Sequence, residues 1–323
     1  MGLSTAQMDG AQSGMTGKVA FCFPGQGSLE AGMAREIAEA VPEAMEILER
    51  CSEASDLDLI RLTFDAPEAE LFDTEVQQPA LVATSLAVLA AIRKRGIKPD
   101  FVVGHSVGEF SALVAASALK VEEAIALVRE RGIAMAEAAK RHPGSMAAIL
   151  GLEDETVERI CRRILNVWPA NYNCPGQIVV SGEHASVDEA CAIAEQEGAR
   201  RAVKLRVSGA FHSPLVAKAA DRLRPALEKV KFNEPTAPFM STVTARIENA
   251  KRMRPLVLEQ LTAPVRFTQA AQALVKEGVN TFVEVGPGNV LSGLVKRIDR
   301  GARTISVSTP AGIAQLEETL GSD

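Results

Sequence analysis

The amino-acid sequence predicts an α/β protein that has a mainly parallel sheet and a smaller α/β unit inserted near the middle of the chain. In the first 140 residues, short β-rich runs alternate with helical apolar patterns. This alternation is typical of a parallel sheet covered by helices on both faces. Residues 144–208 instead show the order β-α-β-β-α-β, which is typical of a compact ferredoxin-like unit.

The large unit is expected to begin with a strand over residues 18–23, which stops at the Pro-Gly-Gln-Gly-Ser turn of residues 24–28. A short buried strand over 101–103 runs into Gly104. Helices are expected up to about residue 50 and over 78–95, 108–116 and 122–140. After the inserted unit, helices alternate with short strands over 238–242, 281–285 and 304–307.

These elements divide the chain into three regions. Residues 1–17 are polar and rich in small residues, and we expect a disordered leader. The large catalytic α/β domain spans 18–143 and 209–323, and the inserted ferredoxin-like subdomain spans 144–208. The subdomain's expected strands are 145–152, 167–173, 176–181 and 202–207, and its expected helices are 154–165 and 185–197.

Composition excludes several classes of protein. The 323 residues are 47% hydrophobic and 24% charged, an ordinary globular balance, and the net charge of −6 argues against a nucleic-acid-binding protein. The apolar run 80–92 is too short to span a bilayer, so it predicts a buried helix and no membrane anchor. Five scattered cysteines without CxxC spacing indicate neither a metal site nor a disulfide framework, which favours a cytoplasmic location.

The strongest local signal for chemistry is Gly-His-Ser-Val-Gly over residues 104–108, between an expected strand and an expected helix. This is the GxSxG pattern of a nucleophile elbow, in which small flanking residues let strand and helix approach closely. It predicts Ser106 as a nucleophile and the backbone N–H of Val107 as an oxyanion donor. The alternative is a glycine-flanked turn with a capping serine.

A catalytic serine needs a base, and the sequence has four histidines. His105 adjoins the nucleophile, so its ring should point away, and His142 and His184 lie in turns that are expected to be exposed. His212 is therefore the best candidate. No acidic partner for it stands out, since the candidates Asp154, Glu183 and Asp188 all fall in the inserted unit as helix-start or surface charges. A backbone carbonyl could orient the ring instead.

Two arginines lie on the mostly apolar helix 122–140, namely Arg129 and Arg131. Arginine's planar fork suits a substrate carboxylate, but either residue could equally be a solvated or ion-paired arginine. Their spacing does not choose between these readings. Gln26 follows the first strand, at the sheet edge where α/β proteins bind ligands, and could also belong to a simple turn.

Seven short motifs, taken in order, resemble those of the malonyl-CoA:acyl carrier protein transacylase family, which includes acyltransferase domains of fatty-acid and polyketide synthases. The resemblance covers about residues 18–308 and implies an α/β-hydrolase-like large domain. The motifs are FPGQGS from Phe23, QQPA from Gln77, GHSVGE from Gly104, RG from Arg131, NYNCPGQ from Asn171, GAFHS from Gly209 and EVGPG from Glu284.

The resemblance implies a role for each matching residue. Ser106 would carry the acyl group, with His212 as general base and then acid. Gln26 and Val107 would supply backbone amides to the oxyanion hole. Arg131 would bind the substrate carboxylate, and the backbone carbonyl of Gln260 would hold the histidine. Asn173 would line the site.

The implied activity is a ping-pong transfer of malonyl from malonyl-CoA to the phosphopantetheine thiol of acyl carrier protein, with no metal or other cofactor and a monomeric enzyme. Relatives that select methylmalonyl often carry a YASH-like sequence where this chain has residues 209–212. Phe211 would fill the space that a branched acyl group needs, although malonyl-selective relatives often have His in place of Gly209. The alternatives are an acyl hydrolase on the same scaffold and a non-catalytic module that docks carrier protein.

Overall fold

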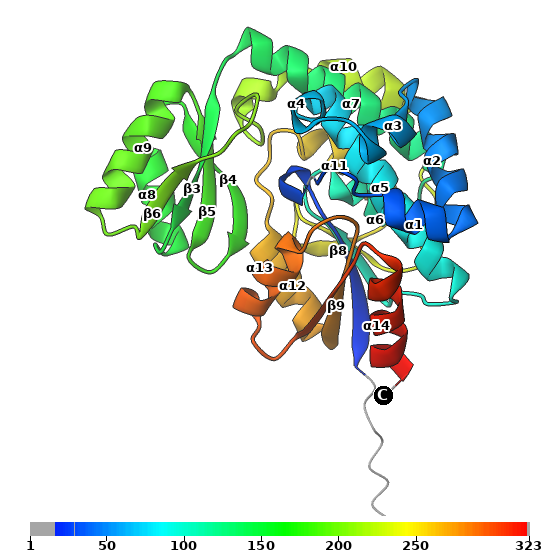
Figure 1. Cartoon of the computed structure of the whole chain (residues 1–323). Helices are drawn as coiled ribbons and strands as arrows, with labels where there is room; N and C mark the ends of the chain where they lie inside the picture. The colour runs from blue at the N-terminus through cyan, green and yellow to red at the C-terminus, as the bar shows by residue number, and fades with distance from the viewer. Residues whose placement is uncertain (1–16, 29, 322–323) are drawn as a thin grey trace, which may run out of the picture.

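The computed structural model describes residues 17–28 and 30–321, and its larger part is a six-stranded sheet (Figure 1). The strand order is β10-β9-β1-β2-β7-β8. The first five of these strands are parallel, and β8 pairs antiparallel with β7 at one edge. The bounds are β1 (Lys18–Phe23), β2 (Phe101–Gly104), β7 (Phe239–Ser241), β8 (Arg246–Glu248), β9 (Val279–Val285) and β10 (Arg303–Val307).

Helices cover both faces of this sheet, as the sequence predicts. They are α1 (Arg35–Ala40), α2 (Pro42–Ser55), α3 (Leu59–Phe64), α4 (Glu68–Leu71), α5 (Thr74–Lys94), α6 (Gly108–Ala115), α7 (Val121–Arg141), α10 (Lys218–Glu228), α11 (Ala250–Glu259), α12 (Phe267–Lys276), α13 (Val290–Ile298) and α14 (Pro310–Gly321). Two short 3-10 helices complete these elements: η1 (Gln26–Ser28) follows β1, and η2 (Pro214–Val216) precedes α10.

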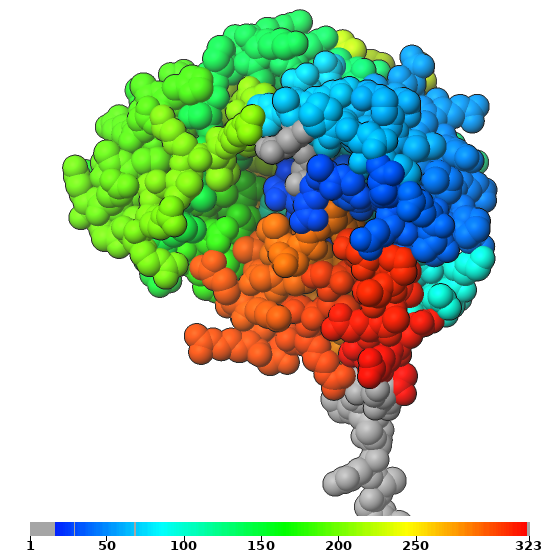
Figure 2. Space-filling model, in the orientation of Figure 1, coloured from blue at the N-terminus to red at the C-terminus, as the bar shows by residue number. Residues whose placement is uncertain are grey.

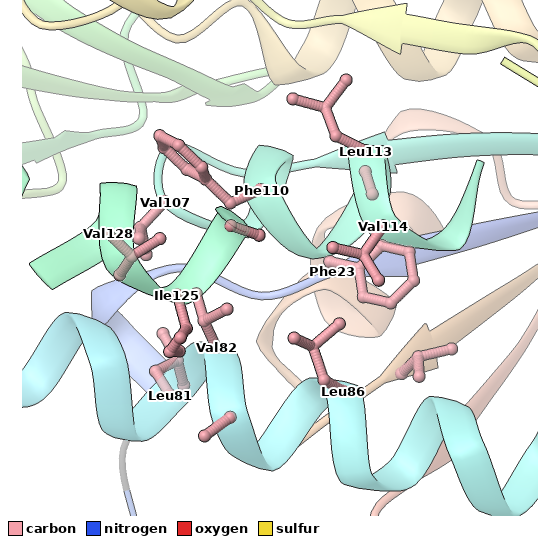
Figure 3. Close-up of a cluster of buried hydrophobic side chains, with 14 of the residues drawn as sticks. Phe23, Leu81, Val82, Leu86, Val107, Phe110, Leu113, Val114, Ile125 and Val128 are labelled. Atoms are coloured by element: carbon pink, nitrogen blue, oxygen red, sulfur yellow. The ribbon is translucent and has the colours of Figure 1, made fainter. Parts of the chain in front are cut away.

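The central strand β1 shows why two helical layers form. Its alternate residues Phe21 and Phe23 belong to the apolar core that includes α5, α6 and α7, and Figure 3 shows Phe23 among Leu86 and Val114. The intervening Ala20 and Cys22 belong to a second core with α12 and α13. Because successive strand side chains point to opposite faces, one buried strand supports both layers.

The second part of the molecule is a four-stranded antiparallel sheet with two helices, drawn in green in Figure 1. The strand order is β4-β5-β3-β6, and the unit has its own apolar core. Along the chain the elements run β-α-β-β-α-β, which is the predicted order. They are β3 (Ser145–Leu150), α8 (Asp154–Arg163), β4 (Val167–Cys174), β5 (Gln177–Gly182), α9 (His184–Gln196) and β6 (Arg201–Lys204).

Several features differ from the sequence-based expectation, and among them are the short helices α3 and α4, which lie between the helices expected up to about residue 50 and from 78. Strand β8 was not predicted, because it is a short edge strand of mostly exposed residues without an apolar run. Strand β6 ends at Lys204 rather than 207, because the Val207 N–H turns back to the Leu205 carbonyl. The expected leader, residues 1–17, lies outside the described residues except for Gly17.

Helix α5 is longer than its apolar run suggests. It has 21 residues, so by length and composition it could cross a membrane, and the prediction that it is too short was wrong. The prediction that it is buried is confirmed, since 78% of its most apolar window lies inside the protein. It packs against α2 and α7 as the central helix of its layer.

The turn between β2 and α6 is held tightly against the end of β1. The His105 N–H donates to the Phe23 carbonyl over 2.9 Å. A Cβ on Gly108 would lie 2.2 Å from that same carbonyl oxygen, and a Cβ on Gly104 would lie 2.2 Å from the Glu109 nitrogen. Since all these neighbours are backbone atoms, any side chain at either glycine would force strand and helix apart.

We therefore expect Gly108→Ala to lower the free energy of unfolding by at least about 1–3 kcal/mol, as in an overpacked core. Gly293→Ala is the matched control, because Gly293 lies on the exposed face of α13 with nothing near its Cβ position. This control should gain about 0.5–1 kcal/mol from helix propensity. Urea unfolding measures both, and equal stability of the two variants would contradict the packing described here.

Candidate active site

A cavity of about 340 Å³ opens where the carboxyl ends of β1 and β2 face the four-stranded unit. The large unit contributes the turn after β1, with Gln26, and the turn after β2, with Ser106. The four-stranded unit contributes Asn171 and Asn173 from β4. In Figure 2 the green unit lies directly beside the blue and orange segments that form the other walls. The cavity brings together most of the residues selected from the sequence.

Ser106 lies at the tip of the turn between β2 and α6, in the left-handed region with φ of 53°. A non-glycine residue rarely adopts this conformation, and the close contacts of Gly104 and Gly108 impose it here. The residue is 8% exposed and lines the cavity. Its Oγ lies 2.8 Å from His212 Nε2.

His212 is held in a fixed orientation by backbone carbonyls. Its Nδ1 lies 2.9 Å from the Gln260 carbonyl and 3.2 Å from the Ala263 carbonyl. Both partners only accept hydrogen bonds, so Nδ1 carries the proton and the lone pair of Nε2 faces the Ser106 hydroxyl. This is the tautomer that a general base requires. Among the residues that the structure describes, the ring's hydrogen-bond partners are Ser106 and these two carbonyls and include no acid.

The surroundings keep His212 uncharged. Burial is the main cause that lowers its pKa, and the positive charge of Arg131 and the nearby ring of His105 lower it further, to about 3. The two carbonyl contacts act in the opposite direction but are outweighed. At neutral pH the ring is therefore the free base.

Arg131 is fully buried behind the serine, with no exposed surface. Its Nη1 donates to Gln78 Oε1 over 2.6 Å, and its Nη2 contacts Ser106 Oγ at 3.2 Å and Gln260 Oε1 at 3.0 Å. Within residues 17–28 and 30–321 its Nε finds no hydrogen-bond partner. Burial lowers the pKa of the guanidinium to about 10, which still leaves it charged at neutral pH.

Arg129, the other candidate, points elsewhere. It donates to the Glu75 backbone carbonyl over 2.7 Å and is paired with the Glu75 carboxylate at 3.7 Å. The structure therefore separates two arginines that sequence spacing left equivalent, because only Arg131 faces the serine.

Gln26 and Val107 are the two residues expected to donate to an oxyanion. Gln26 lines the cavity after β1, and its side chain donates to Gln77 Oε1, which fixes the turn. Val107 follows the serine directly and is the N-cap of α6, so its N–H lies at the positive end of the helix dipole. Its side chain packs into the core, as Figure 3 shows.

Asn173 and Phe211 both line the cavity. Asn173 Oδ1 lies 2.9 Å from His105 Nε2, so the His105 ring points away from Ser106 Oγ, as expected. Phe211 is buried beside Gly209. A Cβ at Gly209 would lie 2.4 Å from Ala139 Cβ on α7, so this backbone leaves no room for a side chain at position 209.

Four residues of this network were not selected from the sequence for a role of their own: Gln77, Gln78, His105 and Glu109. Gln77 and Gln78 lie on α5 and contact Gln26 and Arg131. Glu109 contacts the side chain of Gln260 beneath the serine. The sequence signal that could have selected them was their place in the QQPA and GHSVGE motifs, which contain all four.

The remaining polar candidates lie away from the cavity. Asp188 pairs with Lys204, and Glu183 accepts from Asn166, both within the four-stranded unit. In the part of the chain that the structure describes, no group of three or more His, Cys, Asp or Glu side chains could hold a metal ion.

Comparisons with known proteins place the chain among acyl transferases. The acyl transferase domain family matches residues 20–320. The malonyl CoA-acyl carrier protein transacylase of Bacillus subtilis is 44% identical over 94% of this chain and 97% of its own length. The corresponding protein of Staphylococcus aureus is 40% identical over 90% of this chain and 96% of its own length.

Solved structures are also similar. That of the malonyl CoA-acyl carrier protein transacylase from Coxiella burnetii gives a TM-score of 0.92 at 38% identity, covering 94% of this chain and 98% of that one. A type II polyketide acyl-carrier protein in complex with its malonyl-transacylase gives 0.91 at 37% identity, covering 94% and 99%. The chain therefore belongs to the malonyl-CoA:acyl carrier protein transacylase family of acyl transferases.

Proposed function

We propose that this protein transfers malonyl from malonyl-CoA to the phosphopantetheine thiol of acyl carrier protein through an ester on Ser106. One observation carries the proposal: the serine Oγ lies between a neutral imidazole at 2.8 Å and a buried guanidinium at 3.2 Å, at the floor of a cavity. The first group can activate the hydroxyl, and the second can bind a carboxylate attached to the acyl group.

In the first half-reaction, His212 Nε2 accepts the Ser106 proton while Oγ attacks the thioester carbonyl carbon. The N–H groups of Gln26 and Val107 bind the oxyanion of the tetrahedral intermediate. Its C–S bond then breaks, and the CoA sulfur takes the proton from His212. In the second half-reaction the phosphopantetheine thiol enters, and the same steps run in reverse.

Arg131 is proposed to bind the malonyl carboxylate. Its Nη2 is in contact with Oγ, so an acyl chain of three carbons on that oxygen need only turn back to reach the guanidinium. An acetyl group has no such partner. Phe211 occupies the cavity wall beside the serine and leaves less room for an α-branched acyl group.

The Gln260 carbonyl takes the place that an acid has in a Ser-His-Asp triad. It fixes the His212 tautomer without adding a negative charge. Every step uses groups of this chain and its two substrates, so the proposed reaction needs no metal or redox cofactor.

The finer architecture and cellular setting are part of the same proposal. We assign 144–208 as a ferredoxin-like subdomain, supported by its element order, and 18–143 with 209–323 as an α/β-hydrolase-like catalytic domain. The enzyme would act as a cytoplasmic monomer in fatty-acid or polyketide synthesis. Its five cysteines are all free thiols, which suits a reducing compartment.

The proposal is tested by mixing the protein with malonyl-CoA, with and without acyl carrier protein that bears phosphopantetheine. We expect malonyl-carrier protein to form much faster than free malonate, and Ser106→Ala to abolish transfer. Mass spectrometry of the carrier protein measures transfer, and chromatography measures malonate. Release of malonate at an equal rate in both mixtures would indicate a hydrolase instead, and no turnover with bound carrier protein would indicate a docking module.

The pKa of His212 predicts a flat pH profile on the acid side. Because the pKa of His212 is lowered to about 3, its ring stays neutral as pH falls from 8 to 5. A histidine at its ordinary pKa near 6.5 would be neutral in only about 3% of molecules at pH 5. We expect kcat/KM for acylation of Ser106, which reports the free enzyme, to fall less than about 2-fold over this range. A fall of about 30-fold would contradict the assignment.

A further inference from the structure

Glu109 is a carboxylate buried beneath the nucleophile turn. It lies in the first turn of α6, three residues after Ser106, and is 2% exposed. It is not part of the cavity wall, so substrate does not touch it. A buried carboxylate is costly unless its oxygens are satisfied, so its contacts indicate what it is for.

Each carboxylate oxygen has its own partners. Oε1 accepts from the Thr242 N–H at 2.6 Å and from Thr242 Oγ1 at 2.8 Å. Oε2 accepts from the side-chain amide of Gln260. Thr242 follows β7, so the carboxylate joins the nucleophile helix to the end of a strand on one side and to Gln260 on the other.

These contacts determine which way the Gln260 amide points. A guanidinium can only donate and a carboxylate can only accept, so the bridging amide turns its oxygen to Arg131 and its nitrogen to Glu109. Its Nε2 also donates to the Ser106 carbonyl at 3.1 Å, and its Oε1 accepts from Arg131 Nη2 at 3.0 Å. The backbone carbonyl of the same residue accepts from His212 Nδ1. One residue thus contacts the nucleophile, the base and the arginine.

We propose that Glu109 is a positioning residue for the transfer reaction: by anchoring the Gln260 amide, it holds His212 and Arg131 in register around Ser106. The inference rests on the proposed function. The amide between the two charges keeps the Glu109 carboxylate off the guanidinium. A direct bidentate pair would occupy two of the donors that a substrate carboxylate needs, whereas the contact with Gln260 uses a single Nη2 hydrogen.

The negative charge of Glu109 also helps to keep Arg131 charged. Arg131 is buried without a direct ionic partner among the described residues, and Glu109 is the charged group that raises its pKa against burial. Burial raises the pKa of Glu109 above its ordinary value, and the Thr242 and Gln260 donors and the charge of Arg131 offset this only in part. A proton on Oε2 would have to face the Gln260 nitrogen, so the amide orientation fits a carboxylate that is unprotonated at Oε2.

Glu109→Gln tests the proposal with almost no change in volume. Its new NH₂ group must meet either the Gln260 NH₂ or the Thr242 N–H, so one buried donor loses its acceptor. We expect the single-turnover rate constant for Ser106 acylation at saturating malonyl-CoA to fall about 10- to 100-fold, as for loss of a hydrogen bond to a charged group. A rate constant does not depend on the fraction of molecules that is folded.

A double-mutant cycle with Gln260→Ala distinguishes positioning from a merely structural effect. If Glu109 acts through Gln260, adding Glu109→Gln to Gln260→Ala should slow acylation by less than about 3-fold. If the two substitutions instead slow acylation independently, so that their separate fold-decreases multiply in the double variant, the proposal is overturned. Thr242→Val replaces Glu109→Gln in the same cycle if the latter does not fold, since it removes one donor and keeps the carboxylate.

Glu284→Gln is the matched control. Glu284 is an equally buried carboxylate, but it accepts from the Leu291 and Ser292 N–H groups at the start of α13. In the double variant, we expect the slowing of acylation by Glu284→Gln to multiply the slowing by Gln260→Ala, as for two independent substitutions. The downfield proton resonance of His212 Nδ1, assigned by its loss in His212→Ala, should shift in Glu109→Gln and stay in Glu284→Gln. An unshifted resonance in Glu109→Gln would contradict the proposal.

The proposed function and this inference fail in different ways. If the unmodified protein is not acylated by malonyl-CoA, the proposed function is wrong and the inference falls with it. If the unmodified protein is acylated but the two substitutions act independently, only the role of Glu109 is wrong.

Discussion

A positive charge with no exposure to water is the constraint around which the site is organised. The Arg131 guanidinium reaches Gln78, Ser106 and Gln260 with its hydrogen bonds. Burying an ion costs several kcal/mol even after relaxation, so the surrounding groups must be arranged to offset it. Helix α5, the turn between β2 and α6, and the residue that follows α11 supply acceptors, and Glu109 supplies the opposite charge one residue further away. The same arrangement leaves an anion site beside the nucleophile.

This charge also sets the state of the base. Burial and Arg131 together lower the pKa of His212, so the ring is neutral before substrate enters. Under the proposed function, a bound malonyl carboxylate would neutralise Arg131, and the pKa of His212 would rise. The base would then accept the serine proton more readily when the acidic acyl group is in place than when the site is empty. An acyl group without a carboxylate would not produce this change.

Local patterns in the sequence predicted the fold well. Alternating strand and helix signals indicated the two units, and their main errors were at element ends and at the exposed edge strand β8. The nucleophile turn was predictable because the GxSxG pattern is local, although the contact that requires Gly108 is with the Phe23 carbonyl, far away in sequence. His212 followed because few histidines were available.

Groups that meet only through the tertiary fold were not predictable in the same way. Arg129 and Arg131 are two residues apart on one helix and therefore face directions about 200° apart, yet apolar neighbours surround both in sequence. The Gln260 contacts with Glu109 and Arg131 span 151 and 129 residues. No local pattern encodes which of many distant side chains completes a buried network. The resemblance to a family supplied the Gln260 backbone role, and the structure added its side chain.

Intact-protein mass spectrometry after brief mixing with malonyl-CoA tests the central claim most directly, which is that Ser106 carries the acyl group beside Arg131. The expected result is an increase by one malonyl group that maps to Ser106, is absent in Ser106→Ala, forms more slowly in Arg131→Ala and disappears when acyl carrier protein is added. An adduct that persists in Ser106→Ala, or unmodified protein beside intact malonyl-CoA, would contradict it.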